Sequence, residues 1–175
     1  DEGLYAWVTV NYLLGRVTGP SRDTAAVLDL GGGSTQIATA AGAGAVGLGI
    51  RSTEVLGTQH NMFLHSYLGL GLMAGRSAVL ALAADGPTPC AVKGARISFK
   101  YGDASYNGVR DPDSGPEECI GRVRSLLRSS DGPFAKAPAH PKFSRGQPIF
   151  AMSYYFDRAI YVGLVAPNAV RGRVT

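Results

Sequence analysis

Apolar residues recur at helical spacing at the very start of the chain. Over residues 2–15 (EGLYAWVTVNYLLG), Leu4, Val8 and Tyr12 share one stripe of a helix with 3.6 residues per turn. Trp7, Val10 and Leu14 widen that stripe. Gly15 follows the last apolar residue and is a common type of residue for ending a helix. The pattern therefore predicts a helix over residues 2–15.

Shorter apolar or alternating runs indicate strands further along. Residues 25–30 (AAVLDL) form an apolar run between turn signals, and residues 34–40 (STQIATA) can return beside it as a hairpin. Residues 96–101 (RISFKY) alternate between apolar and polar, and residues 149–156 (IFAMSYYF) also resemble a strand. We expect four strands from these runs.

The rest of the chain is predicted as helices and loops. The pattern is helical over residues 55–82, although several glycines interrupt it, and again over residues 118–129. Residues 102–117 and 130–148 are predicted loops, and the Ala- and Gly-rich residues 40–50 indicate no particular element. Mixed strands and helices favour an α/β fold.

Length and composition limit the possible classes of protein. The 175 residues suit one domain, here residues 1–175, and a hydrophobic content of 45% argues against global disorder. No apolar run reaches the roughly 20 residues of a membrane span, so we expect no membrane contact within the chain. The net charge is +4, and the basic residues are dispersed. The densest group fits a solvated helix face rather than a nucleic-acid site: Arg122, Arg124 and Arg128.

Residues 29–36 (DLGGGSTQ) combine features that suit a phosphate group. Asp29 ends a predicted strand, where it could accept a hydrogen bond from a hydrated cation. Ser34 and Gln36 alternate on the returning strand, so both side chains lie on one face and could hold a water molecule. Glycine lets backbone N–H groups approach anionic oxygens, so the expected phosphate-binding residues are Gly31, Gly32, Gly33, Ser34 and Thr35. The alternative is a structural glycine-rich turn capped by an aspartate.

Three further features allow a structural or a functional interpretation. Glu2 stands at the start of a helix, where the helix dipole alone favours a carboxylate. Cys90 and Cys119 could be free thiols or a disulfide. The aromatic residues 154–156 could belong to the core, or one ring could stack on a nucleobase, with Tyr155 pointing away from its neighbours on a strand.

Four segments in the same order resemble the GDA1/CD39 nucleoside phosphatase family of apyrases and nucleoside diphosphatases. The segments are residues 1–15, 26–38, 65–76 (HSYLGLGLMAGR) and 150–159 (FAMSYYFDRA). The last two look most similar to the nucleoside diphosphatase branch, which includes ectonucleoside triphosphate diphosphohydrolases 5 and 6 and Golgi guanosine diphosphatase. The tail, residues 160–175, does not resemble the family.

The resemblance implies a fold, an activity and a cofactor. The family has two RNase H-like lobes similar to those of actin, Hsp70 and sugar kinases, and this chain resembles most of the second lobe. The expected reaction is hydrolysis of a nucleoside diphosphate (GDP, IDP or UDP rather than ATP) to the monophosphate and phosphate, with Ca²⁺ or Mg²⁺. The first lobe carries another phosphate-binding hairpin that these residues lack. The fragment alone is therefore expected to be inactive.

The resemblance also assigns roles to individual residues. Glu2 matches the general base, Ser34 and Gln36 match residues that position the attacking water, and Asp29 matches a carboxylate that holds the cation through water. The glycine turn at residues 31–33 matches the phosphate-binding turn. Two aromatic residues match the region beside the nucleobase: Tyr155 and Phe156.

The family pairs two cysteines in the positions of Cys90 and Cys119, so the resemblance implies a disulfide. A disulfide suits the oxidising secretory pathway, in the Golgi or endoplasmic reticulum lumen, or a secreted protein. Two alternatives to the enzyme stay open. One is a non-catalytic fragment or pseudoenzyme, and the other is an actin-like ATP-binding protein that shares only the phosphate hairpin.

Overall fold

A computed structural model describes residues 2–42, 44–83, 86–132, 135, 141 and 143–173. The chain divides into two compact units. The first contains Asp1–Ser66 and Pro138–Thr175, and the second contains Tyr67–Ala137. The expectation that residues 1–175 form most of one lobe stays a prediction.

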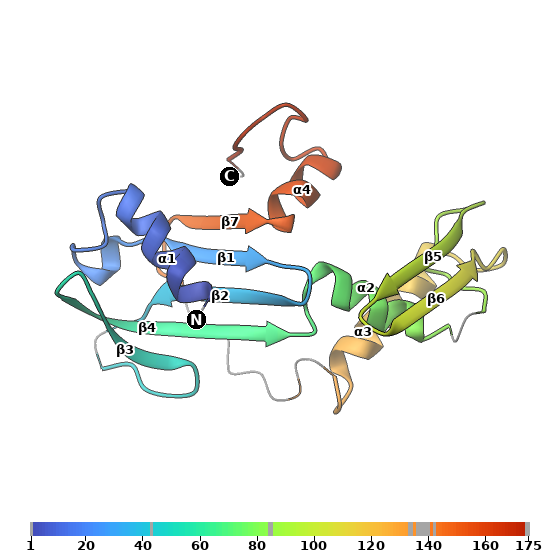
Figure 1. Ribbon diagram of the computed structural model, residues 1–175, viewed down its shortest axis with the longest axis horizontal. Helices are drawn as coiled ribbons and strands as arrows, with labels where there is room; N and C mark the ends of the chain where they lie inside the picture. The colour runs from blue at the N-terminus through green and yellow to red at the C-terminus, as the bar shows by residue number, and fades with distance from the viewer. Residues whose placement is uncertain are drawn as a thin grey trace. The chain divides into compact units, whose positions relative to one another are not determined.

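The first unit is built on a five-stranded sheet (Figure 1). In spatial order its strands are β3 (Ile50–Val55), β4 (Thr58–Leu68), β2 (Ser34–Ala40), β1 (Ala26–Leu30) and β7 (Ile149–Ser153). β1 pairs antiparallel with β2 on one side and parallel with β7 on the other. A mixed sheet with helices confirms the α/β class.

Helix α1 (Glu2–Leu13) packs its apolar side on the sheet. Trp7 is fully buried, and Val10 lies beside it in a core that includes Val27 of β1 and Met62 of β4. Truncation of a buried Trp typically lowers stability by about 3–5 kcal/mol, so this contact is a major anchor of the helix. Of the predicted apolar side, Trp7 and Val10 are buried, whereas Tyr12 is 64% exposed and does not belong to it. The buried stripe consists of Gly3, Trp7, Val10 and Asn11.

Asn11 fastens the end of α1 to the segment that enters β1. Its side-chain Oδ1 accepts a hydrogen bond from the Ala25 N–H at 2.7 Å, and its Nδ2 donates to the Ala25 carbonyl at 3.1 Å. Nδ2 also contacts the Trp7 carbonyl at 3.0 Å. Because a buried amide group needs such partners, Asn11 fixes where the helix lies along the strand.

His60 joins the core of the sheet to the loop after α1. Its ring packs edge-on against Trp7 with centroids 5.0 Å apart, and its Nε2 lies 2.8 Å from the Val17 carbonyl. A carbonyl oxygen only accepts, so Nε2 carries the proton. Nδ1 then accepts from the Ser21 hydroxyl at 3.1 Å, next to the single-turn helix η1 (Ser21–Asp23).

The predicted helix over residues 55–82 was wrong for the first part of that stretch and right for residues 72–81. That stretch holds most of the β3–β4 hairpin, followed by α2 (Leu72–Ala81). Burial of His60 and Met62 follows the period of two that a strand requires. The hairpin turn has positive φ at both central residues, Leu56 (50°) and Gly57 (76°). Leucine is rare in that conformation, which is why the turn gave no recognisable signal.

Two other boundaries differ from those expected. The predicted strand over residues 149–156 ends at Ser153, and Tyr154–Tyr161 form helix α4. Ser153 has φ of 57°, a strained conformation for a residue with a side chain, and it redirects the backbone. The predicted loop over residues 102–117 contains β6 (Ala104–Val109) and the start of helix α3 (Pro116–Arg128). A short polar strand gives little apolar periodicity.

The second unit contains α2, a two-stranded hairpin and α3 (Pro116–Arg128). The hairpin pairs β5 (Arg96–Tyr101), as predicted, with β6 through a two-residue turn. The Cys90–Cys119 disulfide is present, with an S–S distance of 2.05 Å, and ties the loop before β5 to α3. In the described part of the chain, no helix is long and apolar enough to cross a membrane.

Candidate active site

Three predicted site residues of β1 and β2, Asp29, Ser34 and Gln36, lie on one face of the sheet, and Thr35 lies on the other. Asp29 pairs with Gln36 in the antiparallel register, and Val27 pairs with Ala38. Val27 and Ala38 belong to the core beneath α1, and side chains two residues apart on a strand share a face. Asp29 and Gln36 therefore lie on the face that α1 covers. Ser34 lies there too.

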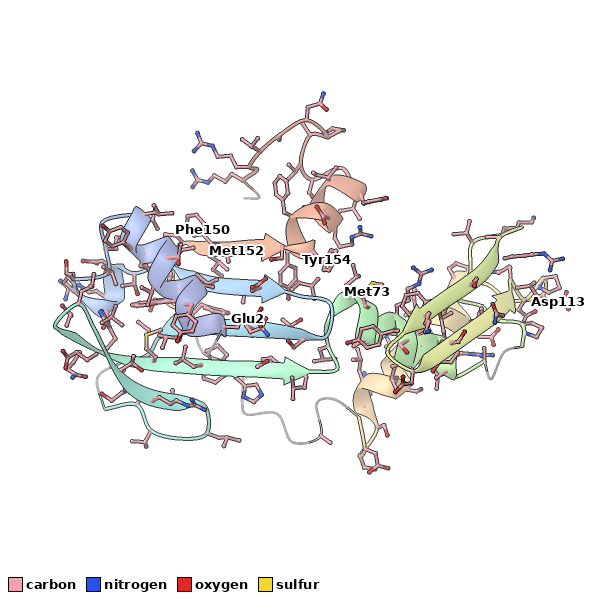
Figure 2. All side chains as sticks on the ribbon, in the orientation of Figure 1. Glu2, Met73, Asp113, Phe150, Met152 and Tyr154 are labelled. Carbon is pink, nitrogen blue, oxygen red and sulfur yellow. A yellow bond between two sulfur atoms is a disulfide. The ribbon has the colours of Figure 1, made fainter. Side chains whose placement is uncertain are left out.

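Glu2 reaches this face from the first turn of α1, as Figure 2 shows. The next residue, Gly3, is buried against β2. A Cβ atom on Gly3 would lie 3.3 Å from Cβ of Gln36, closer than most carbon contacts. Glycine therefore permits the close approach of helix and strand that places the Glu2 carboxylate beside Gln36.

Gln36 is the centre of a polar cluster. The residue is only 4% exposed, and its Nε2 lies 3.0 Å from Oε2 of Glu2 and 2.6 Å from Oγ of Ser34. A third oxygen, Oγ of Ser66, is 3.2 Å away. Gln36 Oε1 is buried and has no hydrogen-bond partner. An acceptor of this kind favours a bound polar ligand, because an unpaired buried group costs about 1–3 kcal/mol.

Ser66 is a member of this cluster that the sequence did not predict. It lies near the end of β4, on the same face as the buried residues His60 and Met62, because all three are separated by even numbers of residues. The segment HSYLGLGLMAGR carries part of the family resemblance, but the pattern over residues 55–82 predicted a helix. The alternation along β4 is the signal that could have placed Ser66 beside the site.

Asp29 presents a second buried acceptor without a partner. Its Oδ1 has no hydrogen bond and is shielded from solvent. No group of three His, Cys, Asp or Glu side chains capable of holding a metal is found among the described residues. A lone carboxylate with a vacant acceptor does not form a protein cage for a cation. It fits a hydrated Ca²⁺ or Mg²⁺ that takes its other ligands from water and phosphate oxygens.

The glycine turn connects Asp29 to the rest of the cluster. The Gly31 N–H donates to the Ser34 carbonyl at 3.0 Å, so this donor serves the hairpin itself. A Cβ on Gly31 would lie 3.4 Å from the same oxygen. Thr35, next along β2, is buried.

The aromatic candidates lie on helix α4, not on a strand, so their expected alternation between two faces was wrong. Tyr155 and Phe156 are partly buried. Burial raises the pKa of the Tyr155 phenol above its usual value, and a hydrogen bond with the Thr35 side chain opposes that shift. Tyr155 therefore lies beside Thr35 of β2. That one of these rings stacks on a nucleobase stays a prediction.

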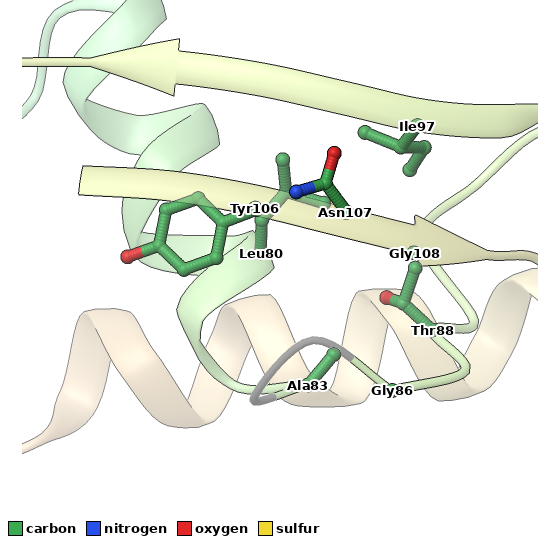
Figure 3. Close-up of a pocket in the computed structure, with 8 residues that line it drawn as sticks. All are labelled: Leu80, Ala83, Gly86, Thr88, Ile97, Tyr106, Asn107 and Gly108. Carbon is green, nitrogen blue, oxygen red and sulfur yellow. The ribbon is translucent and has the colours of Figure 1, made fainter.

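The second unit holds a small pocket between α2, the loop that follows α2 and the β5–β6 hairpin (Figure 3). Its volume is about 10 Å³, enough for a water molecule but far too small for a nucleotide. An open recess of about 400 Å³ lies beside the same hairpin, lined in part by Arg96, Ser98 and Asn107. Neither is lined by a predicted site residue.

With this arrangement in view, comparison with known proteins places the chain in a family of phosphate-transferring hydrolases. The sequence signature of the GDA1/CD39 (nucleoside phosphatase) family matches residues 1–156. The chain belongs to this family. The resemblance expected from the four segments is confirmed.

Characterised relatives support the same family. The chain is 32% identical to Apyrase 1 of Arabidopsis thaliana, over 96% of the chain and 40% of that protein. It is also 32% identical to the human nucleoside diphosphate phosphatase ENTPD5, over 94% of the chain and 40% of that protein. The chain therefore spans about 40% of the length of these relatives.

Among solved structures, a nucleoside triphosphate hydrolase of Neospora caninum aligns with 99% of this chain and 39% of its own. The TM-score is 0.44 and the sequence identity is 19%.

Proposed function

We propose that this chain is most of the second lobe of a longer nucleoside diphosphatase. In the complete enzyme, the lobe supplies the general base and the residues that hold the attacking water. The observation that carries this proposal is the cluster of Glu2, Ser34 and Gln36 on one sheet face, next to two unpaired buried acceptors. Those acceptors are Oε1 of Gln36 and Oδ1 of Asp29.

The cluster can orient a water molecule by accepting a hydrogen bond from each of the two hydrogens of the water. The Glu2 carboxylate accepts one hydrogen, and Gln36 Oε1 can accept the other, which would satisfy the vacant acceptor. Ser34 Oγ lies 2.6 Å from Nε2 of the same Gln36 amide and can contact the same water. When both hydrogens of the water are held, a lone pair of its oxygen can point toward the substrate. In-line attack on phosphorus requires that orientation.

The proposed reaction follows from this geometry. Glu2 removes a proton as the water oxygen bonds to the terminal phosphorus, and the bond from that phosphorus to the bridging oxygen breaks. The products are a nucleoside monophosphate and inorganic phosphate. The bridging oxygen leaves with the monophosphate, and the proton remains on Glu2 until solvent accepts it. No covalent phosphoenzyme forms, because water is the nucleophile.

Two parts of the first unit would bind the phosphate groups and their cation. The turn at residues 31–33 would donate from its backbone to phosphate oxygens, apart from the Gly31 N–H, which is used inside the turn. Asp29 would hold Ca²⁺ or Mg²⁺ through a coordinated water molecule. When bound, the cation neutralises charge on the transferred phosphoryl group.

The substrate class and the cellular location extend the comparison with the relatives. We propose a preference for GDP, IDP or UDP, in line with the nucleoside diphosphate phosphatase named among the relatives. Tyr155 and Phe156 remain the proposed neighbours of the base. The Cys90–Cys119 disulfide supports folding in the secretory pathway.

The test is phosphate release by the complete purified protein. GDP, IDP, UDP and ATP should be offered separately, with Ca²⁺, with Mg²⁺ and with EDTA. We expect release from the diphosphates, little from ATP and none in EDTA. Absence of release from every nucleotide by folded protein would contradict the proposal and favour a non-catalytic member of the family.

A further inference from the structure

The Gln36 side chain has more acceptors around its amide nitrogen than it has hydrogens to share. Nε2 carries two hydrogens, and three oxygens lie within hydrogen-bond distance of it, on Glu2, Ser34 and Ser66. Only two of them can be bonded well at one time. One serine hydroxyl must therefore be released whenever the other and Glu2 are both bonded.

The two serines lie on different strands of the sheet. Ser34 is on the same strand as Gln36, next to the glycine turn, and its Oγ is the nearer acceptor at 2.6 Å. Ser66 reaches Gln36 from β4, the neighbouring strand on the side away from β1, at 3.2 Å. Ser34 thus lies beside the glycine turn of the proposed phosphate site, whereas Ser66 is an exposed residue on the neighbouring strand.

We propose that Ser66 is a positioning residue, which takes the second amide hydrogen of Gln36 and so leaves the Ser34 hydroxyl for the attacking water. This inference rests on the proposed function. Before water binds, the nearer Ser34 holds that hydrogen. When the water engages Ser34, the hydrogen passes to Ser66, and the Gln36 amide keeps both donors satisfied. Its Oε1 therefore stays directed at the water.

Without Ser66, the amide and the water compete for Ser34. The bond that the amide loses is one of ordinary strength, so Ser66→Ala should lower kcat about 3- to 10-fold in the complete enzyme. KM for the nucleotide should change less than about twofold, because the proposed role of Ser66 is exerted through Gln36 on the attacking water and not on nucleotide binding. Ser66→Thr keeps the hydroxyl on a strand-compatible side chain and should recover most of the rate.

A double-mutant comparison separates this role from a general effect on the fold. If Ser66 acts through Gln36, Ser66→Ala should have almost no further effect on kcat in a Gln36→Ala background. Ser52→Ala is the matched control, since Ser52 is a strand serine on β3 whose hydroxyl bonds to Gln59 at 3.3 Å. It should keep full activity. Urea unfolding checks that each variant is folded.

The possible outcomes separate the proposed role of Ser66 from the proposed function of the enzyme. If Glu2→Gln inactivates the enzyme while Ser66→Ala leaves kcat unchanged, the role of Ser66 is wrong and the proposed function stands. Equal losses from Ser66→Ala with and without Gln36 also overturn the inference, because they show an independent effect. If the unchanged protein releases no phosphate, both proposals fall together.

Discussion

The side-chain amide of Gln36 donates a hydrogen bond to the carboxylate of Glu2 over 3.0 Å, although the two residues are 34 positions apart in the sequence. Gln36 is buried in the sheet, whereas Glu2 begins a helix and has a flexible side chain. The hydrogen bond therefore holds the Glu2 carboxylate, the candidate general base, against the rigid sheet. A general base must be held within hydrogen-bond reach of the proton that it removes. This contact supplies that restraint.

Gly3 should be essential to the contact between helix and strand. Gly3→Ala would place a Cβ 3.3 Å from Cβ of Gln36, so α1 and β2 must separate by a few tenths of an ångström. Misplacement on this scale should lower kcat about tenfold, given that 1 Å can lower a rate by about a hundredfold. Steady-state phosphate release from GDP measures the effect.

Gly75→Ala is the control for that substitution. Gly75 lies inside α2, and an added Cβ would meet nothing within 4 Å. We expect unchanged kcat and a gain of about 0.5–1 kcal/mol in the free energy of unfolding, because alanine is the better helix former. A similar loss of kcat in both variants would show that the Gly3 effect is not local.

The disulfide should account for a large part of the stability of the second unit. Cys90 and Cys119 close a loop with a sequence separation of 29. Replacing both with alanine should lower the free energy of unfolding by about 3–4 kcal/mol, mainly because the unfolded chain regains entropy. Urea unfolding with and without the substitutions measures this. Non-reducing peptide mapping of secreted protein should recover the linked pair, and two alkylated thiols would contradict it.

His65 should stay neutral to a lower pH than an exposed histidine. Burial lowers the pKa of its imidazole below 6.5, and the charge of Arg51 lowers it further. A folded-state pKa below the unfolded value makes a contribution to stability that is present above about pH 6.5 and is lost as the pH falls through the folded pKa. An NMR titration of the His65 ring should give a midpoint below 6.5, and a midpoint at or above 6.5 would be inconsistent with this environment.

Asp29 should act on the cation through water. Asp29→Asn keeps the size of the side chain but weakens the acceptor, so the cation concentration for half-maximal GDP hydrolysis should rise and kcat should fall. Circular dichroism should be unchanged, because asparagine has nearly the size and shape of aspartate and fits the same position in β1. An unchanged cation titration, or full activity in EDTA, would remove Asp29 from the metal site.

Parts of the fold with strong local signals could be predicted from sequence. The apolar run before the three glycines predicted the β1–β2 hairpin, and the apolar spacing over residues 2–15 predicted α1. The β3–β4 hairpin could not be recognised, because its turn uses Leu56 at positive φ where Asn or Gly is usual. The end of β7 at Ser153 depends on a strained backbone that composition does not reveal.

The candidate site was only partly accessible from sequence for a similar reason. The alternation of Ser34 and Gln36 predicted their shared face, whereas the roles of Glu2 and Asp29 came from family resemblance. Helix packing decides that Glu2 meets Gln36, and no local pattern contains that information. Ser66 was missed because its position depends on recognising β4 as a strand, which the apparent helical spacing over residues 55–82 obscured.

The most direct test of the account is Glu2→Gln in the complete enzyme. The amide side chain keeps the size of glutamate, and its oxygen can still accept the hydrogen bond from Gln36, but it cannot remove a proton from water. We predict that kcat for GDP falls about 10²- to 10⁴-fold while nucleotide affinity is retained. A kcat within about threefold of the unchanged enzyme would contradict the assignment of Glu2 as the general base.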